Sequence, residues 1–407
     1  MKFIENVDKD KYREFESNHK KSHFLQSYEW GMFCMNAKGQ IPKFVGLENN
    51  GFLVATCLIL LRCTPFGFSY GYAPRGFILD YNDKDLIKEF TAYLNEYMKK
   101  NKIIYIKFDP DIMYQEIDEA GEKIDGGKNN YELYKYMLSL GYKHTGFYKL
   151  YEGNQPRYTF RIDLKKTWEE VEKRFNKSFM KSVKRSNEYN LQIDNEIKVN
   201  DFYRLLQSNS TKDNFDPHSI NYYKIFCEEL AKDDNMKFFN ISIKPKELLI
   251  KIDNEIDTLK KELLVSKKKE ADIKNKLDRL YKEKEVFEKL EDEEVCVCSL
   301  ICTYTKTRAW SLYIGSDDLA NFTFAVTRSY YEAIKDAYNK GYEFFDLFGT
   351  PGDPNTKYKN LAKLHDFKRK FGDNYIEFIG EFDLVNNKLL YKVLPFMLKV
   401  YRKLRSK

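Results

Sequence analysis

The chain has 407 residues, a net charge of +7, 43% hydrophobic and 16% aromatic residues, and only 10 Pro and 19 Gly. This length and apolar content predict two or three domains with hydrophobic cores, and they exclude disordered, collagen-like and small disulfide-stapled proteins. The longest apolar run, 52–61, is about half of the ~20 residues that a membrane-spanning helix needs. The charge-rich N-terminal segment lacks the apolar stretch of a secretory signal, so we expect a cytoplasmic protein.

Two parts of the chain share one order of predicted elements, a strand hairpin followed by a helix and a further strand. The later strands end near Asp109 in the first part and Asp346 in the second. This faint duplication predicts two similar α/β units. In chain order the runs are 51–61, 68–80, 85–101 and 103–110, and then 295–304, 309–316, 324–341 and 342–349.

Segment 246–294 has no Gly or Pro and carries dense, mixed charge. Apolar residues recur with helical 4-3-4 spacing in both of its halves, and the polar stretch 266–270 separates them. We expect two antiparallel helices that bury their apolar seams on each other; one long helix is the alternative. Strand-like runs at 237–243 and 295–304 flank this arm, which indicates an insertion within a domain.

None of the seven cysteines forms a C-x-x-C pair. Cys296, Cys298 and Cys302 lie in an apolar, strand-like run, which favours buried thiols over metal ligands. We therefore expect no metal site and no disulfide.

Several short motifs occur along nearly the whole chain. In order they are QSYEW (26–30), YAPRG (72–76), FDP (108–110), QPR (155–157), IDL (162–164), WSLYIGS (310–316), FDLFG (345–349) and FK (367–368). Together and in this order they resemble the Fem family of non-ribosomal peptidyltransferases. These enzymes add amino acids from aminoacyl-tRNA to the stem peptide of a peptidoglycan precursor, and the staphylococcal-type members carry a coiled-coil arm in the second domain.

The resemblance implies an α/β (α+β) fold with two acetyltransferase-like (GNAT-type) domains and an inserted antiparallel coiled-coil arm. We place the first domain at 1–150 and the second at 151–380, with the arm at 246–294. A C-terminal basic amphipathic segment, 381–407, is expected to pack back on the first domain.

The resemblance also implies the reaction. A stem-peptide amine attacks the ester of an aminoacyl-tRNA that carries glycine, alanine or serine. The acceptor is a lipid-linked or nucleotide-linked muramyl-pentapeptide. Because the ester is already activated, the chemistry needs positioning and oxyanion stabilisation, and we expect no cofactor and no metal.

The candidate catalytic residues are Lys368, Phe367 and Asp109. By resemblance, Lys368 matches a lysine that contacts the tRNA acceptor end and neutralises the oxyanion, and Phe367 matches a residue whose backbone carbonyl faces the reacting site. Asp109 ends a half-buried strand, where it can accept a proton from the amine or line the site. Arg75 lies in a turn that can present its guanidinium to a carboxylate or phosphate. The alternatives are a solvated lysine, an aspartate that only turns the chain, and a surface arginine.

The muramyl-peptide pocket of the family is matched only in part. Tyr222 and Tyr313 match two of its tyrosines, whereas His218 stands where a phosphate-binding arginine is expected. The family has a lysine after Trp30, where this chain has Cys34 or a neighbour. Phosphate binding at these two positions is therefore an open point.

Two basic segments predict contacts with anionic partners. Segment 165–185 carries eight basic and three acidic residues, and on a single helix its cations would form a stripe for tRNA phosphates; a solvated face is the alternative. The tail from 387 mixes apolar residues with seven basic ones, which suits peripheral contact with the inner membrane surface or docking on the first domain. The candidate tRNA-binding residues are Lys173, Lys177, Lys181, Lys184 and Arg185.

Two other functions compete with this interpretation. An acyl-CoA-dependent N-acetyltransferase would need a glycine-rich pyrophosphate turn, which neither 316–324 nor 81–90 supplies. A non-catalytic tRNA- or RNA-binding protein would need only the basic faces and the coiled coil.

Overall fold

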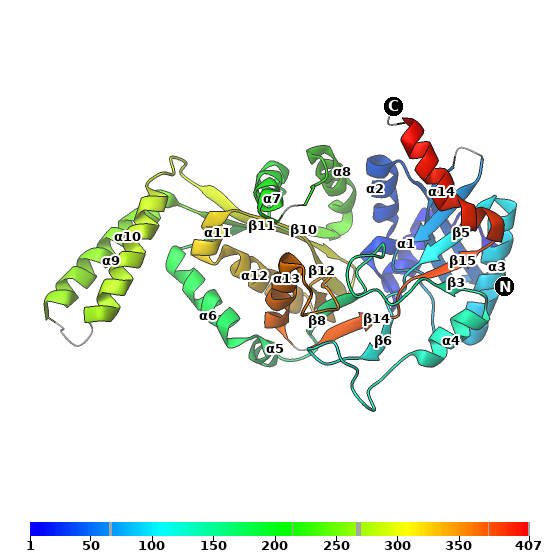
Figure 1. The fold of residues 1–407 in the computed structure, drawn as a ribbon, viewed down its shortest axis with the longest axis horizontal. Helices are drawn as coiled ribbons and strands as arrows, with labels where there is room; N and C mark the ends of the chain where they lie inside the picture. Colours follow the sequence, from blue (N-terminus) through cyan, green and yellow to red (C-terminus); the bar gives the residue numbers. More distant parts are fainter. Residues whose placement is uncertain (65–66, 214, 266–269, 373, 406–407) are drawn as a thin grey trace.

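The computed structural model describes residues 1–64, 67–213, 215–265, 270–372 and 374–405. The chain forms two mixed β-sheets with helices packed on them, and a helical arm that extends from one end of the molecule (Figure 1). The fold class expected from the sequence, α/β with two related units, is confirmed.

The first sheet has seven strands, and all neighbouring pairs are antiparallel except β4 and β5. Helix α3 (Lys84–Lys100) connects this parallel pair, and the Asp83 carboxylate caps it by accepting a hydrogen bond from the Leu86 N–H at 2.9 Å. In spatial order the strands are β1 (Lys2–Ile4), β2 (Ile41–Asn49), β3 (Phe52–Cys63), β4 (Ser69–Ala73), β5 (Ile103–Phe108), β15 (Phe382–Val385) and β7 (Lys143–His144).

The second sheet repeats this plan in eight strands. Strands β12 and β13 are its parallel pair, and α12 (Ala325–Asn339) connects them. The order is β6 (Met113–Glu116), β14 (Tyr375–Phe378), β8 (Tyr158–Asp163), β13 (Phe344–Asp346), β12 (Arg308–Ser316), β11 (Val295–Tyr304), β10 (Met236–Ile243) and β9 (Gln192–Asp194).

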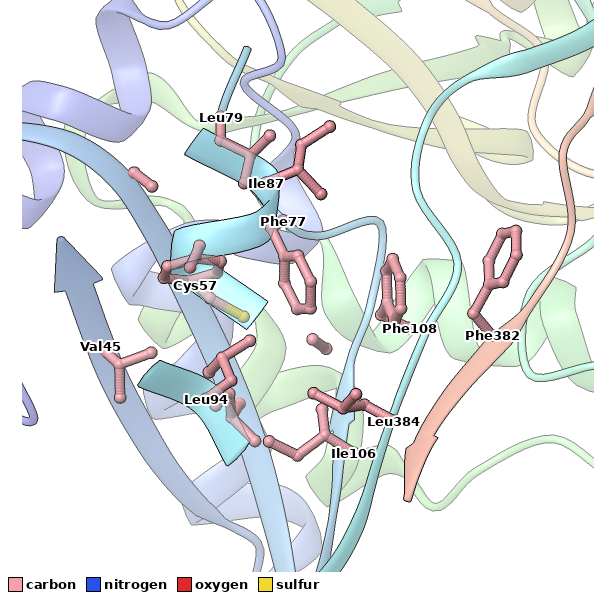
Figure 2. Close-up of a cluster of buried hydrophobic side chains, with 14 of the residues drawn as sticks. Val45, Cys57, Phe77, Leu79, Ile87, Leu94, Ile106, Phe108, Phe382 and Leu384 are labelled. Carbon is pink, nitrogen blue, oxygen red and sulfur yellow. The ribbon is translucent and has the colours of Figure 1, made fainter. Parts of the chain in front are cut away.

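The two units exchange strands, so a boundary at residue 150 does not divide the sheets cleanly. Strand β6 pairs with β14 in the second sheet, and β15 pairs with β5 in the first. Figure 2 shows the effect of this strand exchange in the hydrophobic core of the first unit, where Phe77, Phe108 and Phe382 lie side by side. The ring centroids are 4.4 Å apart for Phe77 and Phe108 and 5.6 Å apart for Phe108 and Phe382.

A shared apolar cluster joins the two units. Phe24 and Trp30 from the N-terminal part pack with Phe238 and Trp310 of the second sheet. The other helices are α1 (Lys9–Asn18), α2 (Tyr28–Lys38), α4 (Tyr131–Ser139), α5 (Trp168–Arg174), α6 (Lys177–Ser186), α7 (Val199–Asp213), α8 (Ile220–Leu230), α11 (Asp318–Thr323) and α13 (Lys359–Lys368). Short 3-10 turns occur at Phe24–Gln26, Asn187–Tyr189, Lys232–Asp234 and Arg369–Phe371.

The arm consists of α9 (Pro245–Val265) and α10 (Glu270–Phe287). Their apolar seams are buried against each other, and ion pairs join Lys276 to Glu255 at 2.6 Å and Lys284 to Asp253 at 2.5 Å. The helices are therefore antiparallel, and the prediction of two helices rather than one long helix is confirmed. The predicted turn between them falls largely on 266–269, outside the described residues.

The C-terminal helix α14 (Lys388–Arg405) follows β15 and packs on the first unit. The Tyr391 hydroxyl donates to the Asp383 carboxylate at 2.6 Å, and its ring meets the Tyr105 ring edge-on at 5.2 Å. Among the described residues, the helices are too short or too polar to cross a bilayer.

Candidate functional site

Asp109 is buried at the end of β5, with 3% of its surface exposed. The Tyr72 hydroxyl donates to its two carboxylate oxygens at 3.1 and 3.2 Å, and the Arg75 backbone N–H donates at 2.9 Å. Burial raises the pKa of Asp109 to about 7; the charge of Arg75 opposes this rise and that of Glu381 adds to it. A carboxyl group that gains and loses a proton near neutral pH is suited to act as a proton acceptor.

Gln26 fixes the turn that presents the Arg75 backbone. Its side-chain amide donates to the Pro74 carbonyl at 2.8 Å and the Leu58 carbonyl at 3.2 Å, and its amide oxygen accepts from the Leu58 N–H at 2.9 Å. A Cβ on Gly76 would approach the Gln26 side chain to 3.0 Å, so only glycine fits this close packing without displacement. The first two sequence motifs, QSYEW and YAPRG, therefore form one structural unit.

The Arg75 guanidinium is buried rather than on the surface, with 6% of the residue exposed. It donates to the Pro156 carbonyl at 2.7 Å and lies 4.2 Å from the centre of the Phe378 ring. The surface arginine considered from the sequence is therefore wrong, and Arg75 lines the cleft at Asp109 that is described below. Arg75 holds in place the connector between the two units, residues 145–157 between β7 and β8.

A narrow cleft with a volume of about 10 Å³, close to that of a single water molecule, lies at Asp109 between β5, the connector and the start of β15. Glu381 lies in its wall, 3.2 Å from the Lys107 ammonium group. The lining residues are Arg75, Asp109, Tyr148, Leu150, Gly153, Gln155, Pro156, Arg157, Phe378, Gly380 and Glu381.

Lys368 is also buried, with 7% of its surface exposed, so the solvated-lysine alternative is wrong. Its ammonium group donates to the Phe348 carbonyl at 2.6 Å and the Gly349 carbonyl at 2.7 Å. Burial lowers its pKa to about 7, which the charge of Asp346 partly offsets. The neighbouring Phe367 ring packs against Phe371 at 5.3 Å, which fixes the end of α13.

A short series of contacts joins Asp109 to Lys368. Arg75, whose backbone binds Asp109, holds the Pro156 carbonyl. Pro156 packs so tightly on Gly349 that a Cβ at Gly349 would lie 2.2 Å from its ring. The Gly349 carbonyl in turn accepts from Lys368. The structure thus brings Asp109 and Lys368 to the same connector.

A buried ion-pair network supports the turn beside Lys368. Asp346 accepts from the Arg161 guanidinium and the Phe348 N–H, each at 2.7 Å. Arg161 also pairs with Asp111 at 2.7 Å and holds the pKa of that carboxyl far below its usual range, against the opposing effect of burial. The network fixes the Phe348 carbonyl that Lys368 binds.

A second group of candidate residues lies between α8, β12 and α2. The Tyr222 and Tyr313 hydroxyls are 3.1 Å apart, and the His218 ring stacks on Tyr222 at 4.0 Å. The Lys38 ammonium group lies 5.5 Å from the centre of the same tyrosine ring. Burial lowers the pKa of His218, and the charge of Lys38 adds to this effect.

Lys38 lies beside these candidate residues, and the sequence analysis did not single it out. The expected cation after Trp30 was sought near Cys34, but Cys34 is 1% exposed and packs in the shared apolar cluster. Lys38 lies two helical turns after Trp30 on α2, 5.1 Å from the centre of the indole ring. The helical spacing of i to i+8 was the signal that would have found it. Tyr72 and Glu381, which also face Asp109, gave no comparable local signal.

The basic segment 165–185 is not one helix, so the prediction of a single stripe is wrong. Phe175 is extended between α5 and α6, and Asn176 caps α6 by accepting from the Ser178 N–H at 2.7 Å. Lys173 lies on α5 and pairs with Glu169 at 2.9 Å. On α6, Lys177, Lys181 and Lys184 are exposed, whereas the Arg185 guanidinium lies 4.5 Å from the centre of the Phe324 ring.

Cys296, Cys298 and Cys302 are buried in β11, as predicted. Within the described ranges, no group of three or more His, Cys, Asp or Glu side chains is placed to hold a metal ion.

Comparisons with known proteins agree with this architecture. A model of the FemAB family matches residues 7–399. The lipid II:glycine glycyltransferase of Staphylococcus epidermidis is 27% identical over 99% of both chains, and that of Staphylococcus aureus is 23% identical over 97% of both. A crystal structure of FemX, 22% identical, superposes with a TM-score of 0.78 over 97% of this chain and 99% of that chain, so the two share a fold. With its family model matched over nearly the whole length, the chain belongs to the FemAB family.

Proposed function

We propose that this protein transfers glycine from glycyl-tRNA to an amine of the stem peptide of lipid II. The observation that carries the proposal is similarity over almost the full chain to relatives named lipid II:glycine glycyltransferase. The sequence alone left glycine, alanine and serine open, and the names of these relatives favour glycine. They also favour the lipid-linked acceptor over the nucleotide-linked one.

The proposed chemistry is direct aminolysis. The neutral amine attacks the ester carbonyl, the new C–N bond forms, and the carbonyl oxygen becomes an oxyanion. Asp109 accepts the proton that the amine loses, since its pKa of about 7 allows it to be ionised before the step and protonated after it. The oxyanion then re-forms the carbonyl, the C–O bond to the tRNA breaks, and the departing tRNA oxygen takes the proton back from Asp109, which leaves a tRNA hydroxyl and an ionised Asp109.

Lys368 is proposed to stabilise the oxyanion. A lysine ammonium group has three N–H donors, and two of them bind the Phe348 and Gly349 carbonyls in the described structure. The third is available to the reacting oxygen, and the low-dielectric surroundings strengthen that interaction. By family resemblance, the backbone carbonyl of Phe367 is proposed to face the reacting centre.

Tyr222, Tyr313, His218 and Lys38 are proposed to bind the muramyl-peptide part of the acceptor. Hydroxyl groups and a cation beside aromatic rings can hold phosphate oxygens and sugar hydroxyls together. Lys38 supplies the positive charge that the sequence analysis did not find after Trp30. Arg75 is proposed to position the connector rather than to bind substrate.

The exposed lysines of α6, together with Lys173 and Arg185, are proposed to contact the tRNA backbone. Such contacts weaken steeply with salt and carry little base specificity. Lys177, Lys181 and Lys184 recur at helical spacing on α6 and form the continuous part of this surface.

The test is a reconstituted transfer assay with lipid II and tRNA charged separately with radiolabelled glycine, alanine or serine. Glycine label should reach the lipid, Lys368→Ala should lose transfer, and Lys363→Ala, an exposed lysine on the same helix, should keep it. Transfer from another amino acid alone would contradict the donor assignment. Retained tRNA binding without any transfer would support the RNA-binding alternative. Acetyl transfer from acetyl-CoA would support the acetyltransferase alternative.

A further inference from the structure

Helix α14 has one packed face and one exposed apolar face. Leu394 is 3% exposed and Tyr391 contacts β5 and β15, so these residues face the first unit. Leu389 and Phe396 are 72% and 70% exposed, and Val393 between them is 38% exposed. The spacing of i, i+4 and i+7 places these three side chains in one stripe along the helix.

Cations accompany this stripe. Lys388, Lys392 and Lys399 are exposed on α14, and their spacing places them in a second row beside the apolar one. The residues from 388 to 405 include six Lys or Arg and no Asp or Glu. The exposed surface of α14 therefore combines large apolar side chains with a positive charge that no acid on the helix offsets.

We propose that this surface of α14 docks on an anionic lipid bilayer, with Leu389, Val393 and Phe396 inserted and the lysines at the headgroups. An RNA backbone would use the lysines but would leave the three exposed apolar side chains without a partner. A second copy of the helix would bring two rows of like charge together. An anionic bilayer matches both rows at once.

If the acceptor is lipid II, as in the proposed function, the position of α14 suits a substrate that is anchored in a bilayer. The helix is tied to β15 through the Tyr391–Asp383 hydrogen bond, and Lys107 of β5 pairs with Asp383 at 2.9 Å. Glu381, immediately before β15, lines the cleft that contains Asp109. A bilayer bound at the exposed face of α14 would thus be separated only by this helix from the strands that border the cleft.

The test is sedimentation of the full chain with vesicles of phosphatidylcholine, with and without phosphatidylglycerol. Binding should require the anionic lipid. Leu389→Asp with Phe396→Asp should weaken it at least about tenfold, since each side chain then loses its apolar burial. Replacing Lys388, Lys392 and Lys399 by Ala should weaken it about fivefold per lysine. The matched controls Leu264→Asp and Phe52→Asp change residues that are 88% and 78% exposed elsewhere and should not alter binding.

Each outcome separates this inference from the proposed transfer reaction. Glycine transfer to a water-soluble acceptor without the lipid chain should be equal in the wild type and the Leu389/Phe396 variant, because α14 contributes no group to the reaction. Vesicle binding that survives the aspartate substitutions would overturn the inference. So would loss of binding by the two control variants, or self-association through α14 without lipid binding. Vesicle binding without any glycine transfer would leave the inference intact and reject the proposed function.

Discussion

The Asp109→Asn variant should become more stable relative to the wild type as the pH rises. The folded state holds the Asp109 proton up to a pKa of about 7, whereas the ordinary value is 3.8. Between these values the folded state binds more protons than the unfolded state, so raising the pH through this window destabilises the wild type. With these two pKa values, the raised pKa of Asp109 lowers the free energy of unfolding of the wild type by about 1.7 kcal/mol at about pH 5 and by about 4 kcal/mol at about pH 8.

Asparagine has nearly the same shape as aspartate but does not ionise, so it adds no such pH-dependent loss of stability. The stability difference between Asp109→Asn and the wild type should therefore shift by about 2–3 kcal/mol in favour of the variant between about pH 5 and about pH 8. Urea unfolding at both pH values measures this shift, with Asp272→Asn, an exposed site on α10, as the control. An equal difference at both pH values would refute the reasoning. In the transfer assay, the acidic limb of the wild-type pH profile, centred near the same pKa, should be absent from the variant.

Three further substitutions test the supports of the site. Arg161→Met should destabilise the protein by about 3–5 kcal/mol in urea unfolding, because it leaves two buried aspartates without their cation. Gly349→Ala places a Cβ 2.2 Å from Pro156; it should cost about 1–3 kcal/mol and reduce glycine transfer more than tRNA binding. Leu280→Ala should destabilise the arm by about 2–5 kcal/mol and speed proteolysis within 246–294, whereas Leu264→Ala, which is exposed, should not.

Local patterns were enough to predict the elements whose structure depends on their own sequence. The strand-like runs at 237–243 and 295–304 became β10 (Met236–Ile243) and β11 (Val295–Tyr304). The arm was predicted because each half carries its own apolar seam, and a helix pair needs only that seam and a partner of similar length. The repeated order of hairpin, helix and strand likewise followed from periodicity alone.

The break between α5 and α6 was not predicted, because its cause lies elsewhere in the chain. Segment 165–185 contains no Gly or Pro to end a helix. Phe175 leaves the helical path where its ring packs with Phe179 at 5.2 Å and Phe371 at 6.3 Å. The Asn176 N–H donates to the Lys370 carbonyl at 2.8 Å instead of continuing the helix. Residues about 195 positions later in the chain thus decide the local structure.

The burial of the charged candidate residues could not be predicted from local sequence patterns either. Lys368 lies in a run of basic residues that reads as a solvated turn, yet carbonyls 19 and 20 positions earlier accept its hydrogen bonds. Arg75 is enclosed because the connector, about 80 residues later, lies across it. A sequence shows which residues can carry charge, whereas the tertiary path of the chain decides which of them lose their water.

The duplication places two aspartates at the same end of two parallel strand pairs, but their surroundings assign them different tasks. Asp346 ends β13 beside β12 and is bound by Arg161, Thr159 and the Phe348 N–H. Asp109 follows β5 beside β4; no ion pair between described residues includes it, and its donors are a hydroxyl and a backbone N–H. The paired aspartate, through its hydrogen bonds to Arg161 and the Phe348 N–H, supports the turn at Lys368. The unpaired one is free to exchange a proton, so the proposed chemistry belongs to the first unit and its electrostatic support to the second.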